Sequence, residues 1–181
     1  YILDRKGNKR VSLNQPVSAS LNTNMRLTKS GRIAFAGKDG QIYTVSFSGA
    51  VEKKKAADFS PEAFFDYSDI DSDGAAEYLF YDNGSFSAYK DDMSLLFTLR
   101  MVTQRYPEPE VLSFGPDEKR IALTDDTEGK VWLFDGRGKT ESGFPVNGTI
   151  APVSVKISPS SGYTVITGGP DNSLCCYKVT R

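Results

Sequence analysis

Short runs of alternating apolar and polar residues follow one another along almost the whole chain, separated by turns rich in Gly, Asp and Asn. Alternation with a period of two is the pattern of a strand with one buried face. The best helical candidate, residues 50–65, is interrupted by Pro61, and its Lys53, Lys54 and Lys55 are typical of a solvated outer edge strand. The pattern therefore predicts an all-β protein.

Four segments share one form, in which an apolar strand, a polar turn and a second alternating strand follow one another. They read RIAFAGKDGQIYTV, EYLFYDNGSFSAY, RIALTDDTEGKVWLF and YTVITGGPDNSLCCY. The second strands align at Ile42, Phe86, Val131 and Leu174. The resulting spacings of 44, 45 and 43 residues are close to the ~40 to 45 residues of a four-stranded propeller blade. We expect the four aligned residues to be equivalent and buried between sheets.

The first residues of the chain join this repeat, because YILDRKG overlays WLFDGRG with Asp4 opposite Asp135. Glycine beside Asp or Asn in the turns permits the positive φ of tight hairpins, so each unit is predicted to be a four-stranded antiparallel meander. Such units bury both faces of their sheets only by stacking on one another. The predicted fold is a β-propeller, either partial or of about four blades. We expect one repeat domain over residues 1–181, with blade boundaries at 1–17, 18–60, 61–104, 105–148 and 149–181.

The N-terminal residues match the third and fourth strands of a unit, whereas the last residues match a third strand. The chain also begins with Tyr1 instead of Met. We therefore expect a fragment of a longer chain with ~7 to 8 blades, the alternative being that the N-terminal strands complete the last blade. An incomplete ring exposes the apolar faces of its end blades, which predicts self-association.

Composition narrows the classes of function. The 22 basic and 23 acidic residues nearly cancel, so no basic field attracts nucleic acid. No apolar run approaches the roughly 20 residues of a membrane helix, so no membrane span is expected. Histidine is absent, which excludes histidine-dependent catalytic triads. The two cysteines, Cys175 and Cys176, are predicted to be small apolar strand residues, and a strained vicinal disulfide is the alternative.

The segment DIDSDGAAE, residues 69–77, alternates acids in its first half and ends on another acid. Gly74 permits a sharp turn between the two halves. Alternating carboxylates with one carbonyl facing inward form the oxygen-rich set that Ca²⁺ prefers, and a water completes it. We therefore predict one structural calcium ion whose ligands are Asp69, Asp71, Asp73, the carbonyl of Ala75 and Glu77.

An EF-hand is excluded here, because its twelfth loop position would be Phe80, which cannot bind a cation. A solvated acidic turn is the remaining alternative, although three alternating acids repel one another without a cation. The acidic turns at residues 125–128 and 171–172 lack the alternation and are predicted to be plain turns.

The loop resembles the calcium loop of integrin-type, FG-GAP-like propeller repeats, and departs from it at Glu77, where those loops usually carry Asp. The repeated segments, including FFDYSDIDSDGAAEYLF and GGPDNSLCCY, resemble the C-terminal, propeller-like region of uncharacterised bacterial envelope proteins. They are loosely similar to quinoprotein-like and WD-repeat propellers. The resemblance implies an extracytoplasmic location, in the periplasm or at the bacterial surface. The single Trp132 does not provide the tryptophan-docking repeat of quinoproteins, so no quinone cofactor is expected.

Two classes of function fit a β-propeller with these sequence features. The first is a non-catalytic binding or scaffold module whose rim loops contact another protein or a glycan. The second is a histidine-free propeller glycoside hydrolase or lyase. The repeated Asp-box of sialidase-like propellers is absent, so the sequence favours the non-enzyme. A pocket with two carboxylates ~5 to 10 Å apart and converging arginines would favour the enzyme. A flat, neutral rim would favour the binding module.

Overall fold

The computed structural model describes every residue except 56–58, 102–107, 159 and 180–181. Its described residues form strands and turns, and the one helical element among them is the short 3-10 turn η1, Pro170–Asn172. The prediction of an all-β protein is confirmed. Among the described residues, no helix has the length and hydropathy needed to cross a membrane.

The chain forms two compact units. The first comprises Tyr1–Ser68, Ala75–Asn83 and Ser87–Leu95, and the second comprises Asp69–Gly74, Gly84–Phe86 and Leu96–Arg181. The strands of one sheet are therefore shared between the units. This sheet is an antiparallel meander of β7 (Phe64–Ser68), β8 (Glu77–Asp82), β9 (Ser85–Tyr89) and β10 (Leu95–Arg100).

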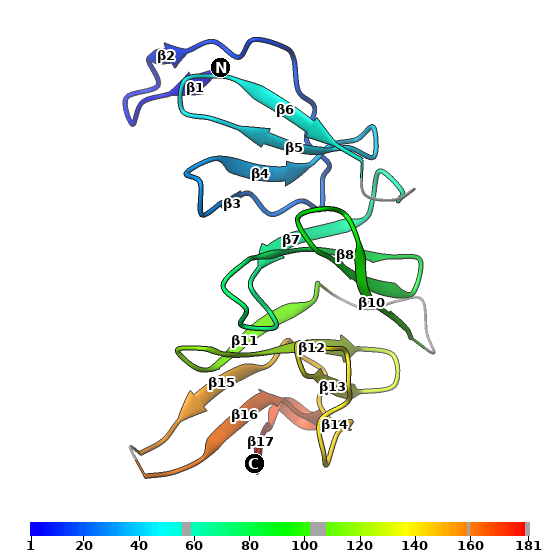
Figure 1. Cartoon of the computed structure of the whole chain (residues 1–181). Coiled ribbons are helices and arrows are strands. Elements are labelled where there is room, and N and C mark those ends of the chain that lie inside the picture. Colours follow the sequence, from blue (N-terminus) through cyan, green and yellow to red (C-terminus); the bar gives the residue numbers. More distant parts are fainter. Residues whose placement is uncertain (56–58, 102–107, 159, 180–181) are drawn as a thin grey trace. The chain divides into compact units, whose positions relative to one another are not determined.

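The first unit contains a two-stranded sheet and a four-stranded meander, drawn in blue and cyan in Figure 1. Their strands are β1 (Ile2–Leu3), β2 (Lys9–Val11), β3 (Arg26–Leu27), β4 (Ile33–Ala36), β5 (Ile42–Val45) and β6 (Val51–Lys54). β6 is the outer strand of its sheet, as the lysine run at its end predicts.

Both faces of the four-stranded sheet β3–β6 are buried. On one face Ala34, Ala36 and Ile42 pack with the β7 and β8 residues Phe65, Tyr78 and Phe80. On the other face Phe35, Tyr43, Val45 and Val51 pack with side chains of the preceding segment, including Leu13 and Val17. Because this short sheet has apolar residues on both sides, it needs a neighbour on each side, as stacked blades provide.

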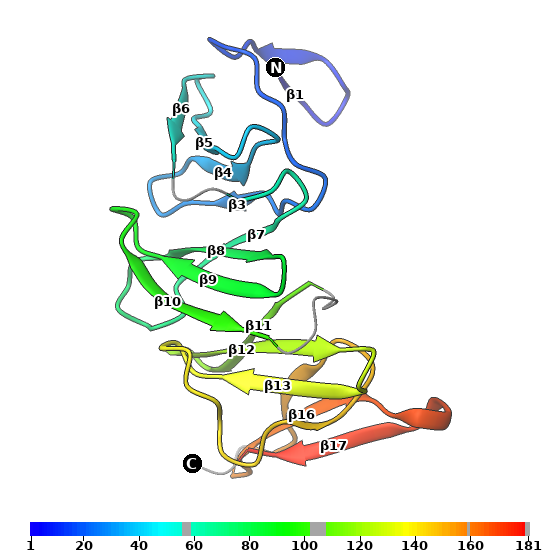
Figure 2. The same cartoon turned by 90° about the vertical axis from the view of Figure 1, so that its right-hand side faces the viewer.

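The second unit contains a four-stranded and a three-stranded antiparallel meander. In both views β16 and β17 lie side by side, in orange and red (Figures 1 and 2). The strands are β11 (Glu110–Gly115), β12 (Glu118–Asp125), β13 (Lys130–Phe134), β14 (Val146–Asn147), β15 (Val153–Lys156), β16 (Tyr163–Gly168) and β17 (Leu174–Lys178). The core between these sheets is built from Leu112, Phe114, Ala122, Leu133 and Val165.

The same five-residue turn recurs where a third strand leads into a fourth. In each copy the first residue's amide bonds to the fifth residue's carbonyl, and the fourth residue's amide bonds back to the first residue's carbonyl. The first residues of the four copies are Asp4, Ser46, Lys90 and Asp135. The fourth residue has positive φ every time, as Gly7, Gly49, Met93 or Gly138. The predicted alignment of Asp4 with Asp135 is confirmed, and each sheet lies within one predicted blade segment.

The predicted burial of the four aligned residues is confirmed at three of them. Ile42, Phe86 and Val131 are fully buried, whereas Leu174 is 76% exposed. The prediction is wrong at Leu174, because β17 pairs only with β16 and alternate residues of β17 face solvent. Among the described residues, nothing covers this face of the last sheet.

Candidate metal centre

The predicted calcium loop connects β7 to β8, as the sequence indicates. The two strands pair through Ser68 and Glu77, so the first and last acids of the loop are brought together by the strand register. β7 and β8 are anchored by the buried residues Phe65, Tyr78 and Phe80, which hold the base of the loop in place. The local fold therefore follows from apolar strands on either side of a polar, glycine-containing connection.

Three of the four predicted carboxylates come together. Asp69, Asp71 and Glu77 each offer an oxygen atom within 4.8 Å of the others. Glu77 is fully buried, and the other two are half-buried. Asp73 and Ala75 lie on the exposed stretch of the loop, and the carboxylate of Asp73 is outside this group. The structure thus brings three of the predicted ligands together, while ligation of a metal by any of the five residues stays a prediction.

Backbone amides of the loop donate hydrogen bonds to two of these acids. The amide of Gly74 donates to Asp69 Oδ2 at 3.0 Å, and the amide of Asp73 donates to Asp71 Oδ1 at 3.1 Å. Ser72 and Gly74 adopt positive φ values of 63° and 87°, which wind the tip tightly. Within the part of the chain that the structure describes, Asp69 Oδ1 is buried without a hydrogen-bond partner. A buried carboxylate oxygen without a donor is an expected feature of a cation ligand.

The tip of the loop, residues 69–74, is seated against a turn of the unit to which it belongs. A Cβ atom built at Gly136 would lie 2.7 Å from Cα of Asp71, and still closer to the carbonyl oxygen of Ile70. Only glycine permits this approach. The sequence marks this glycine only as part of the DGRG turn, so its role in holding the loop was missed.

Glu77 also acts on its surroundings through its charge. Burial raises the pKa of Tyr67, and the negative charges of Asp91 and Glu77 raise it further. Tyr78, the residue after Glu77, donates a hydrogen bond from its hydroxyl to Asp91 Oδ1 at 3.0 Å. Burial and this hydrogen bond together raise the pKa of Tyr78 strongly. A cation beside Glu77 would offset part of this concentration of negative charge.

The other two acidic turns have ordinary turn geometry. Asp125 Oδ1 accepts the amides of Thr127 and Glu128 at 2.9 and 3.0 Å, which is an ordinary Asp-capped turn. Asp171 and Asn172 adopt left-handed conformations with φ near 58°. In the described ranges, the 69–77 loop holds the only group of three or more acids close enough for a metal. Cys175 and Cys176 are free thiols in β17, which confirms that they form no disulfide.

A second feature, which no motif in the sequence indicates, is a cavity of about 600 Å³ in the second unit. Its walls include Phe114, Arg120, Glu141, Lys156 and Tyr163. The residues come from two hairpins, β11–β12 and β15–β16, and from one loop, which are far apart in sequence. Neither spacing nor composition could therefore have brought them together.

No family model and no curated protein matches this chain. Solved structures do match in fold. The Dos1 propeller has a TM-score of 0.63 and 15% identity over 98% of this chain and 49% of its own. BBS1N, solved in complex with ARL6DN, has a TM-score of 0.57 and 10% identity over 86% of this chain and 49% of its own. Virginiamycin B lyase from Staphylococcus aureus has a TM-score of 0.57 and 13% identity over 99% of this chain and 62% of its own.

These similarities, together with the four-stranded antiparallel meanders, show a β-propeller fold. The chain spans about half to three fifths of the length of the three matched structures. At 10 to 15% identity the likeness concerns the fold alone. The matched structures include a lyase and a domain solved with a protein partner, so the fold by itself is compatible with both classes of function.

Proposed function

We propose that the chain is a non-catalytic propeller module for binding or scaffolding, in which one structural Ca²⁺ organises the β7–β8 loop. The observation that carries the metal proposal is Asp69 Oδ1, buried without a hydrogen-bond partner in the described part of the chain and close to carboxylate oxygens of Asp71 and Glu77. Hard oxygen ligands of this kind suit Ca²⁺. Asp73, the carbonyl of Ala75 and water complete the proposed shell.

The ion would act by removing an electrostatic penalty. Carboxylates held within a few ångströms repel one another, and burial of Glu77 adds a desolvation cost. A divalent cation offsets both effects in the folded loop only. Binding should therefore raise the free energy of unfolding by RT ln(1 + [Ca²⁺]/Kd), about 2.7 kcal/mol at a hundredfold excess over Kd.

Unfolding of the protein in excess Ca²⁺ and in chelator tests this proposal. The wild type should be more stable in Ca²⁺, and Asp69→Asn should abolish the difference because it removes the charge at nearly constant shape. Asp126→Asn, an exposed acid outside the group, is the matched control and should keep the full response. A wild-type unfolding curve that is identical in Ca²⁺ and chelator would refute the metal site.

The partner proposal rests on the fold. Propeller loops vary over a rigid sheet framework, which suits contact with a protein or glycan at the blade rim. The matched BBS1N was solved in complex with ARL6DN, so a propeller of this type can hold a protein partner. We further propose an extracytoplasmic location, in the bacterial envelope, because the repeated segments resemble those of bacterial envelope proteins. Self-association through the exposed face that carries Leu174 belongs to the same proposal.

The alternative, a histidine-free hydrolase or lyase, has one observation in its favour. The cavity of the second unit holds the carboxylates of Glu118 and Glu141. However, both of them form ion pairs with the one guanidinium of Arg120. Neither carboxylate is then presented to a substrate as an acid or nucleophile, and among the described residues the cavity lining includes no second arginine. This arrangement favours binding over catalysis.

A further inference from the structure

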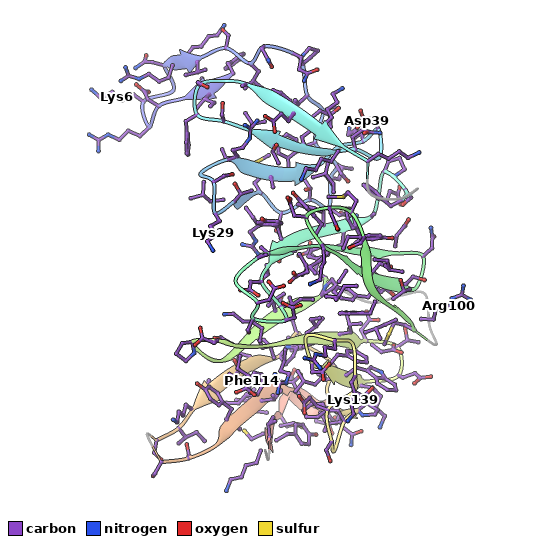
Figure 3. The ribbon with its side chains drawn as sticks, in the orientation of Figure 1. Lys6, Lys29, Asp39, Arg100, Phe114 and Lys139 are labelled. Carbon is purple, nitrogen blue, oxygen red and sulfur yellow. The ribbon has the colours of Figure 1, made fainter. Side chains whose placement is uncertain are left out.

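The cavity of the second unit combines a rigid apolar base with a charged opening. Phe114 of β11 is buried, and its ring lies 5.2 Å from that of Tyr163 of β16, between centroids, in a tilted arrangement. Arg120 of β12 lies over the Phe114 ring at 5.8 Å. Its guanidinium is held by Glu118 at 2.8 Å and by Glu141, so this wall is fixed by ion pairs. Figure 3 labels Phe114 within this unit.

Two lysines at the cavity carry charge that the fold does not neutralise. Lys156 of β15 and Lys178 of β17 are exposed, and neither has an ion-pair partner within the described ranges. Lys156 Nζ lies 5.9 Å from the centroid of the Tyr163 ring. Among the described lining residues, three basic groups (Arg120, Lys156 and Lys178) stand against two acids (Glu118 and Glu141), so the net formal charge of the cavity is +1.

We propose that this cavity binds an organic anion that carries a flat ring, with a carboxylate as the anionic group. The ring would pack on the exposed part of the Tyr163 ring and the neighbouring apolar surface, while the carboxylate would bind Lys156 and Lys178. Aromatic rings stack favourably at offset or tilted geometry, and ammonium groups bind carboxylates by charge-assisted hydrogen bonds. A volume of about 600 Å³ falls within the usual range of small-molecule pockets. The proposal is independent of the calcium loop.

A pair of fragment probes tests the proposal. The probes are 4-fluorobenzoate and the neutral 4-fluorobenzamide, which share the ring and differ in charge, and binding is followed by ¹⁹F NMR in one calcium-containing buffer. The wild type should bind the benzoate about threefold or more tightly, as expected for two partly exposed ion pairs. Lys156→Gln combined with Lys178→Gln should remove this preference. Lys139→Gln, an exposed lysine outside the cavity that Figure 3 labels, should retain it.

The aromatic half of the proposal has its own variant. Tyr163→Leu should weaken both probes by a similar factor, because it removes the ring surface without changing charge. Equal binding of the two probes to the wild type would overturn the proposal. A preference for the benzoate that survives in the double lysine variant would also overturn the proposal. The same holds if neither probe binds to the wild type. Circular dichroism checks that each variant is folded, and the single Lys156→Gln variant replaces the double variant should the latter fail to fold.

Discussion

Gly136→Ala should loosen the calcium loop without replacing any proposed ligand. The new methyl group would lie 2.7 Å from Cα of Asp71, where apolar carbon atoms prefer about 3.5 to 4.0 Å. The loop backbone must then move away by roughly 1 Å. Overpacking of this kind costs about 1 to 3 kcal/mol, offset by roughly 0.5 kcal/mol because alanine restricts the unfolded chain. We expect a net loss of about 0.5 to 2.5 kcal/mol in unfolding free energy.

The same displacement should lower calcium affinity, because Asp71 would move relative to Asp69 and Glu77. Changes in residues that support metal ligands typically cost about tenfold to a hundredfold in affinity. Urea unfolding with and without Ca²⁺, together with calorimetric titration, measures both effects. Gly162→Ala is the matched control, because its new Cβ would lie at an ordinary 3.4 Å from the nearest atom, the carbonyl oxygen of Val179. Gly136→Ala unfolding with the stability and calcium response of the wild type would refute the reasoning.

Two further predictions concern the hydrophobic core and the loss of stability at acidic pH. Val131→Ala should lower the free energy of unfolding by about 2 to 3 kcal/mol because Val131 is fully buried. Leu174→Ala should change it by less than about 0.5 kcal/mol because Leu174 is 76% exposed. Equal losses in urea melts would contradict the assignment of β17 as an uncovered edge strand. The hydrogen bond from Lys54, supported by one from Tyr78, holds the pKa of Asp91 below its usual 3.8. Its contribution to stability is therefore present above pH 3.8 and is lost as the pH falls through the lower folded pKa. Asp91→Asn should flatten the acid limb of a stability profile slightly, and less in 1 M salt because the Asp91 side chain is 68% exposed; an unchanged profile in low salt would contradict the prediction.

The repeat and its strands could be predicted from local information. Period-two alternation places Ile42, Phe86 and Val131 inward regardless of what covers them, and Asp-Gly turns such as Asp135–Gly138 close by their own hydrogen bonds. The position of the calcium loop follows for the same reason, because it lies between two strands that pair directly. Its first and last acids meet through the Ser68–Glu77 register, which depends on local chain direction alone.

Other features depend on which surfaces meet, and these only the tertiary structure decides. Leu174 has the same local pattern as its buried counterparts, yet it is exposed because nothing among the described residues covers the face of the sheet on which it lies. Gly136 resembles any turn glycine until the backbone of Ile70 and Asp71 is placed against it. The cavity around Arg120 unites side chains from separate strands, and no spacing in the sequence encodes that union. Strand alternation and turn geometry arise from interactions within a few residues, whereas burial, close approach and cavities arise from distant segments that pack together.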